Sequence, residues 1–243
     1  MAGGFPRRSS RRAPPNATGG ALSRESPLDP SPAQLTLAPD ERLELFPGAF
    51  LLRGFALPDD ERLRADVLAV SAAAPFRHMQ TPGGFTMSVA MTNCGSRGWV
   101  SDATGYRYSA LDPSSGLHWP AMPAAFESLA RRAAATAGFP GFAPDACLVN
   151  RYEPGARLTL HQDKDERDYR EPIVSVSLGV SAVFLFGGLK RKDRPLRLSL
   201  VHGDVVVFGG PSRLRYHGVA PLPPGQHPFA GQARINLTLR RAA

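Results

Sequence analysis

The second half of the chain is divided into short segments in which apolar and polar residues alternate. From Ala146 onward this period of two recurs in eight stretches, at 146–152, 157–164, 172–179, 182–187, 196–201, 204–208, 213–219 and 233–240. Gly or Pro separates them, as at Gly187-Gly188 and Gly209-Gly210-Pro211. Short alternating strands joined by tight turns, with no helix between them, predict a jelly roll or a related barrel.

Helices are expected only in the first half. Pro58-Asp59-Asp60 predicts a helix start, because proline is preorganised for the first turn and carboxylates suit its positive end; Pro75 ends this helix. A second helix is expected from about Pro123 to Ala137. The expected fold class is therefore α+β, mainly β, with a double-stranded β-helix (jelly-roll) core and supporting N-terminal helices.

The domain organisation follows from composition. Residues 1–33 are rich in Pro, Gly, Ser and Arg without a hydrophobic period, which predicts a disordered basic tail. Residues 34–243 are expected to form one domain with its jelly-roll core at 143–241. Residues 76–120 combine methionines and aromatics with polar loops, which suits either a packed hairpin or a lid that stacks on a base.

Charge and cysteine content limit the partners and the compartment. The formal net charge of +8 favours a polyanionic partner such as nucleic acid. We expect no membrane association, because no apolar run is long enough to cross a bilayer. Two cysteines and the lack of a recognisable signal peptide predict a reducing, cytoplasmic location.

The stretch from Leu158 to Asp165 carries the strongest chemical signal. Read as a strand, it places His161, Asp163 and Asp165 on one face. A histidine and a carboxylate two residues apart can hold two positions of the 2-His-1-carboxylate triad typical of non-haem Fe(II). The missing histidine has two candidates, His202 and His217. A turn at His202-Gly203-Asp204 explains the first fully, and the second lies in a late strand beside Gly218.

The last predicted strand has an unusual polar face. It carries Arg234, Asn236, Thr238 and Arg240 opposite the apolar face of Ile235, Leu237 and Leu239. Two arginines buried in a barrel require an anion, and a dicarboxylic acid would satisfy both. The alternative is a half-solvated outer strand whose arginines point into water.

Together these motifs resemble the AlkB family of Fe(II)/2-oxoglutarate dioxygenases, and in particular its bacterial founding branch. The likeness runs from about Phe50 to Arg240. The matching segments are 81–95, Asn150-Arg151-Tyr152, 161–165, 175–179, Phe186-Gly187-Gly188 and the final Arg/Asn strand.

The resemblance implies a role for each matched residue. His161, Asp163 and His217 would bind Fe(II). The 2-oxoglutarate carboxylates would be bound by Arg234 and Arg240, assisted by Asn236, Asn150 and Tyr152. Trp99 and His161 would sandwich a flipped base, and Asp165 would face its exocyclic amine or positive charge and take part in catalysis. The lid and the phosphate-contacting groove would be lined by Tyr106, Thr81, Met91, Lys190 and Arg191. The chain departs from the expected pattern at Phe85, where a tyrosine is expected, and at Arg215, where an aromatic residue is expected.

The activity that the resemblance implies is oxidative demethylation of N-alkylated bases such as 1-methyladenine and 3-methylcytosine, with release of formaldehyde. Its cofactors would be Fe(II), 2-oxoglutarate and O2. Its substrate would be single-stranded alkylated DNA, with RNA as a further substrate. The enzyme would be a monomer. Two alternatives remain: the same chemistry on a protein or small molecule, and a non-catalytic jelly roll that binds nucleic acid. His161→Ala separates them, since only an oxygenase would lose turnover.

Overall fold

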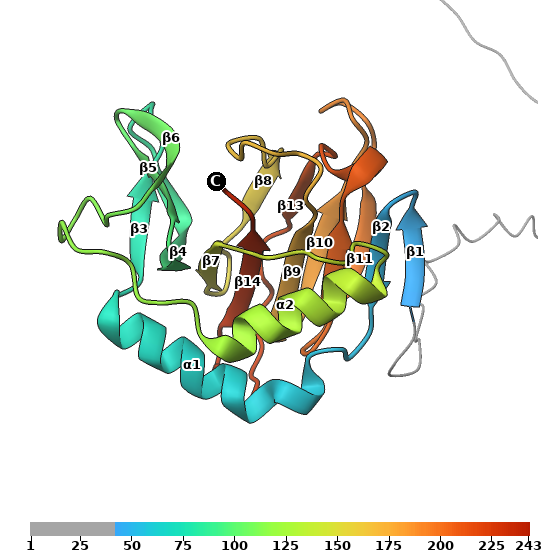
Figure 1. Ribbon diagram of the computed structural model, residues 1–243, viewed down its shortest axis with the longest axis horizontal. Helices are drawn as coiled ribbons and strands as arrows, with labels where there is room; N and C mark the ends of the chain where they lie inside the picture. The colour runs from blue at the N-terminus through green and yellow to red at the C-terminus, as the bar shows by residue number, and fades with distance from the viewer. Residues whose placement is uncertain (1–41) are drawn as a thin grey trace, which may run out of the picture. The chain divides into compact units, whose positions relative to one another are not determined.

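The computed structural model describes residues 42–243, so the tail predicted for residues 1–33 lies outside the described part of the chain. Two antiparallel sheets face each other, and a small hairpin stands at one edge (Figure 1). This mainly β architecture confirms the predicted fold class. No helix in residues 42–243 is long and apolar enough to cross a membrane.

The strands divide into one large sheet, one small sheet and one hairpin. In spatial order the large sheet contains β1 (Arg42–Phe46), β2 (Ala49–Leu52), β12 (Val205–Phe208), β9 (Ile173–Gly179), β14 (Arg234–Arg240), β7 (Ala146–Tyr152), β4 (Thr86–Gly95) and β3 (Arg77–Gln80). The small sheet contains β11 (Leu196–Leu200), β10 (Ala182–Phe186), β13 (His217–Val219) and β8 (Leu158–His161). The hairpin pairs β5 (Gly98–Asp102) with β6 (Gly105–Ser109).

Two helices cover the outer face of the large sheet, α1 (Asp60–Ala73) and α2 (Ala124–Thr136) (Figure 1). The buried stripe of α2 includes Phe126, Leu129 and Ala133, which pack in one apolar cluster with the outward-facing side chains of the sheet. The same stripe contains the buried alanines Ala125, Ala130, Ala133 and Ala134, whose small side chains let the helix lie close to the strands. Two short 3-10 turns, Leu57–Asp59 and Gly210–Ser212, complete the described helices.

The central strand β14 is buried on both faces. Ile235, Leu237 and Leu239 pack into the helix-facing cluster, whereas Arg234 and Arg240 line the cavity between the two sheets. The strand is hydrogen-bonded to β7 on one side and β9 on the other. The alternative of a half-solvated outer strand is therefore wrong for this segment.

Two strands are shorter than the period of two predicted. The strand expected over 157–164 ends at His161, so Asp163 and Asp165 lie in a loop rather than on a strand face. The chain leaves the sheet there because side chains, not a neighbouring strand, bond the backbone of this loop and of the segment opposite it: Arg213 donates to the Asp163 carbonyl, and the Gln162 side chain donates to the Leu214 carbonyl. The strand expected over 213–219 is reduced to β13 because residues 210–216 form turns.

The second His-x-Asp motif has a structural role. His202 Nδ1 accepts a hydrogen bond from the Gly179 amide at 2.9 Å, and its Nε2 lies 3.1 Å from Asp60. Asp204 is fully buried and accepts from the amides of Gly54 and Val201 while pairing with Arg53. These contacts join the β11–β12 turn to the segment that precedes α1.

Asp204→Ala should lower the free energy of unfolding by about 3 kcal/mol, because it leaves a guanidinium and two amides without their buried partner. Urea denaturation measures this loss. Asp168→Ala is the matched control: Asp168 pairs with Arg170, whose side chain is 91% exposed, so the midpoint should not move. Equal effects of the two changes would contradict the structural role of Asp204.

Candidate metal centre and adjoining cavity

Three side chains meet at the mouth of the small sheet. His161 ends β8, His217 begins β13 directly opposite it, and Asp163 follows in the loop after β8. Their potential ligand atoms all lie within 4.8 Å of one another. The Asp163 carboxylate oxygens lie 3.6 Å from His161 Nε2 and 3.7 Å from His217 Nε2. Antiparallel pairing of two strands thus brings together residues 56 positions apart in the sequence.

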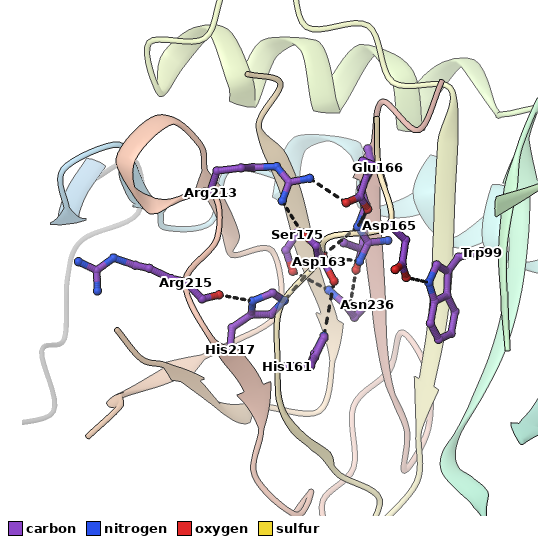
Figure 2. A network of polar contacts seen from close by, with 12 residues as sticks. Trp99, His161, Asp163, Asp165, Glu166, Ser175, Arg213, Arg215, His217 and Asn236 are labelled. Atoms are coloured by element: carbon purple, nitrogen blue, oxygen red, sulfur yellow. Dashed lines mark hydrogen bonds and ion pairs between the residues drawn. The ribbon is translucent and has the colours of Figure 1, made fainter. Parts of the chain in front are cut away.

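Both histidines are oriented by backbone carbonyls. His161 Nδ1 lies 2.9 Å from the Thr159 carbonyl. His217 Nδ1 lies 3.0 Å from the Arg215 carbonyl (Figure 2). A carbonyl only accepts, so each Nδ1 must carry the proton and each Nε2 keeps its lone pair for a metal. A cluster of two such imidazoles and one carboxylate is the donor set preferred by non-haem Fe(II).

The electrostatics keep these groups in their metal-binding forms. Desolvation and then the neighbouring His217 lower the pKa of His161 to about 4, so its ring is neutral at pH 7. Burial opposes ionisation of Asp163, but Arg240 and His217 together lower the pKa of its carboxyl well below the usual value. The Asp163 carboxylate and the neutral imidazole of His161 are therefore ready to bind a divalent cation.

A second part of the site is a buried cation, Arg234, that pairs with no carboxylate among residues 42–243. The Arg234 side chain is 1% exposed, and its Nη2 donates to Ser177 Oγ at 2.9 Å. Within residues 42–243, Nε and Nη1 of this guanidinium have no hydrogen-bond partner. Desolvation lowers the pKa of Arg234. A buried guanidinium with two free donors fits a carboxylate, which is what 2-oxoglutarate would supply.

The residues beside Arg234 form a fixed polar floor. Asn236 Nδ2 donates to Ser175 Oγ and to the Val176 carbonyl, each at 2.9 Å. Its Oδ1 accepts from Asn150 Nδ2 at 3.1 Å and from Thr238 Oγ1 at 2.9 Å. These bonds hold the amides in one orientation, while the Tyr152 ring lies 5.1 Å from the Arg234 guanidinium.

Arg240 is placed differently from Arg234. Its Nε and Nη2 donate to Asp163 Oδ2 at 2.9 and 2.6 Å. Burial lowers the pKa of Arg240, but the Asp163 carboxylate more than offsets this and the pKa is raised. Arg240 therefore fixes the carboxylate of the metal cluster and lines the cavity at the same time.

One cavity of about 850 Å³ contains both parts of the site. Among the residues expected to contact a base, it is lined by Trp99, Tyr106, Asp165, Thr81, Met91 and Arg191. Lys190 is exposed on the adjoining turn and is not part of the lining. The Trp99 and Tyr106 rings are stacked with centroids 5.6 Å apart, and Trp99 Nε1 donates to Asp165 at 2.8 Å (Figure 2).

The two departures noted in the sequence lie at different places. Phe85 is 77% exposed at the rim of the cavity, so the hydroxyl that it lacks would face solvent or a substrate. The Arg215 guanidinium stacks on the Phe46 ring at 3.7 Å and donates to the Gly187 carbonyl at 2.8 Å. It thus fills the space of an aromatic residue with a flat cation that fastens β1 to the small sheet.

Sequence reasoning did not identify the buried ion network behind the metal cluster. Glu166 and Arg213 are almost completely buried and pair at 3.0 Å, and Tyr108 donates to Glu166 at 2.7 Å. In the sequence, Glu166 lies in a run of charged residues that is typical of a solvated loop. Tyr106 and Tyr108 lie two residues apart on β6 and so share one face of the strand, which predicts an aromatic face but does not show that Tyr108 reaches Glu166.

Comparisons with known proteins agree with this geometry. The family model described as the 2OG-Fe(II) oxygenase superfamily matches residues 48–240. The chain is 60% identical over 195 residues to the alpha-ketoglutarate-dependent dioxygenase AlkB of Escherichia coli, covering 80% of this chain and 90% of that protein. It is 36% identical over 174 residues to the DNA N(6)-methyladenine demethylase ALKBH1C of Arabidopsis thaliana, covering 61% and 38%. The structure of OsALKBH1 superimposes with a TM-score of 0.73 at 30% identity, covering 83% of this chain and all of that one.

Proposed function

The chain belongs to the AlkB family of 2OG-Fe(II) oxygenases, and from this membership we propose that it demethylates alkylated nucleic-acid bases by oxidation. It is an Fe(II)- and 2-oxoglutarate-dependent dioxygenase. The observation that carries the proposal is that one cavity contains both the His161–Asp163–His217 cluster and the stacked rings of Trp99 and Tyr106. A flat base can enter between aromatic surfaces there and present its alkyl group to the metal.

Each part of the site has a separate task. Bound Fe(II), 2-oxoglutarate and O2 supply hydroxylation of the N-methyl carbon, after which the repaired base and formaldehyde separate. His161, Asp163 and His217 would hold the metal, and Arg234 would bind one carboxylate of the co-substrate. Asn150 and Tyr152 shape the space beside that guanidinium. Arg240 orients Asp163 through its two hydrogen bonds and faces the same space.

The substrate is proposed to be single-stranded. A base stacked in a duplex cannot reach the cluster, and extruding it costs a few kcal/mol, which a single strand avoids. Arg191 at the cavity edge and the exposed Lys190 beside it would contact phosphates. RNA is included in the proposal because none of these contacts depends on the sugar. A monomer suffices, since the described chain alone supplies every proposed group.

Asp165 is proposed to select cationic bases. Its carboxylate lies in the cavity lining and is bound by the Trp99 ring nitrogen. Bases such as 1-methyladenine and 3-methylcytosine carry a positive charge, which a carboxylate attracts and an amide does not. Asp165→Asn should therefore lower kcat/KM for 3-methylcytosine about tenfold, a loss typical of one charged contact, and affect a neutral alkylated base much less. Equal losses on both substrates would argue against charge selection.

The proposed activity is tested by formaldehyde release from single-stranded DNA that carries 3-methylcytosine, with and without Fe(II) and 2-oxoglutarate. Release that requires both additions supports the proposal. Succinate without formaldehyde would retain the oxygenase and move the substrate to a protein or small molecule. No succinate from correctly metallated protein would leave only nucleic-acid binding, with its salt-dependent affinity, as the function.

A further inference from the structure

The β5–β6 hairpin is joined to the metal-binding loop by two hydrogen bonds. Trp99 and Tyr108 are directly opposite in the hairpin, so their side chains leave the same face. Trp99 Nε1 donates to Asp165 at 2.8 Å, and the Tyr108 hydroxyl donates to Glu166 at 2.7 Å. One cross-strand pair of the hairpin therefore meets two consecutive carboxylates that follow Asp163 in the chain.

The two carboxylates lie in different environments. Asp165 is exposed and lines the cavity. Glu166 has a side chain only 2% exposed and lies between two guanidiniums, with Arg213 Nη2 at 3.0 Å and Arg240 Nε at 3.4 Å. Arg213 is itself tied to the carbonyls of Asp163 and Glu171. Moving Glu166 would separate buried charges, whereas moving Asp165 would not.

We propose that Tyr108 and Glu166 are positioning residues that anchor the hairpin, while the Trp99–Asp165 bond is the contact that an entering base replaces. The anchor joins the hairpin to Arg240 and, through it, to Asp163 of the metal cluster. The exchange at Asp165 rests on the proposed function, because it requires a base with an amine or a positive charge. The anchor itself requires only the contacts described.

The properties of Tyr108 suit a permanent anchor. Burial raises the pKa of its hydroxyl well above the usual value, so the group stays protonated and remains a donor. Its acceptor is a buried carboxylate, and such charge-assisted bonds are about twice as strong as neutral ones. When a base takes Asp165 from Trp99, the Tyr108–Glu166 bond keeps the hairpin at a fixed height above the metal cluster.

Tyr108→Phe tests the anchor, since it removes one hydroxyl and keeps the ring. Hydrogen exchange of the hairpin amides, residues 98–109, is measured on the full chain without nucleic acid. Exchange should become about tenfold faster, the factor that corresponds to one charge-assisted hydrogen bond. Tyr106→Phe is the control for exchange: Tyr106 is 48% exposed, and no hydrogen bond joins its hydroxyl to residues 42–243, so exchange should not change. Exchange in Tyr108→Phe equal to that of the control would overturn the proposal.

Glu166→Gln tests the second half of the anchor. Affinity for Mn(II), measured by calorimetry, should weaken about tenfold because Arg240 loses a partner and orients the metal-binding carboxylate of Asp163 less well, while Tyr108→Phe should change it less than twofold. An unchanged dissociation constant in a folded Glu166→Gln protein would contradict the link to Arg240. If this variant does not fold, exchange in Tyr108→Phe still decides.

Steady-state kinetics separate anchoring from the proposed reaction. Tyr108→Phe should raise KM for the methylated oligonucleotide about tenfold and lower kcat much less, because a loose hairpin binds the base poorly without changing the chemistry. Faster hairpin exchange in a protein that releases no formaldehyde would keep the anchor and refute the demethylase. Formaldehyde release together with unchanged hairpin exchange in Tyr108→Phe would support the demethylase and refute the anchor.

Discussion

Replacing Arg234 by Met should abolish co-substrate binding and leave the protein at least as stable as before. The Arg234 guanidinium is buried with Nε and Nη1 unpartnered within residues 42–243, so the ligand-free fold bears an uncompensated charge. Met has a similar length, fills the space beside the Tyr152 ring and carries no charge. The dissociation constant for 2-oxoglutarate should rise at least about a hundredfold, as expected for loss of a buried charge pair.

The measurement is thermal unfolding with and without 2-oxoglutarate in the presence of Mn(II). The variant should show an equal or higher Tm without ligand and no shift when ligand is added. Arg213→Met is the control, because Arg213 is equally buried but fully engaged with Glu166 and two carbonyls. Its removal should destabilise the protein by about 3 kcal/mol. If Arg234→Met destabilises the protein as much as Arg213→Met does, Arg234 is not an uncompensated charge in the ligand-free fold.

His217→Ala should reduce turnover by at least about a thousandfold, the scale of loss when a residue essential to the reaction is removed. Only one imidazole and one carboxylate remain, too few to hold the metal in a defined geometry. The fold should survive, because the apolar core beside the lost ring, which includes Phe184 and Phe208, remains in place. Succinate formation and equilibrium dialysis with Mn(II) report the two losses independently.

His202→Ala provides the matched control for His217→Ala. His202 begins the other His-x-Asp motif, and its bonds go to Gly179 and Asp60. This change should lower the unfolding midpoint and leave metal affinity intact. Retained turnover in His217→Ala, or lost metal binding in His202→Ala, would reverse the assignment of the second histidine.

The fold could be predicted from the sequence because alternation of apolar and polar residues is a local property. All eight stretches with a period of two contain strands of the two facing sheets. The errors lie at Gln162 to Asp165 and at Arg213 to Tyr216, where side chains from distant parts of the chain take the backbone groups that a neighbouring strand would have used. Local patterns contain no information about such partners.

In the site, too, local patterns predict the position of a residue but not its distant partners. Arg234 and Arg240 occupy equivalent positions on one strand face, and nothing in the sequence distinguishes them. Arg240 nevertheless pairs with Asp163, 77 residues away, and Arg234 has free donors within residues 42–243. Glu166 could not be identified from the sequence either, because it stands in a run of charged residues. Its neighbours Lys164 and Asp165 are exposed, whereas the side chain of Glu166 is buried. Which member of a charged run is buried depends on contacts across the fold.

The position of β14 has a consequence for how this enzyme can change. The groups proposed to hold the co-substrate lie on a strand that is hydrogen-bonded along both edges, at the centre of eight strands. The aromatic pair proposed to stack on the base, Trp99 and Tyr106, lies on a two-stranded hairpin at the periphery, outside that ladder (Figure 1). Substitutions at Trp99 and Tyr106 can therefore alter which bases are accepted, while Tyr108 keeps its bond to Glu166 and the metal cluster is not disturbed. The aromatic pair that would contact the base and the arginine that would bind the co-substrate therefore lie on separate elements, and the first can change while the second is kept.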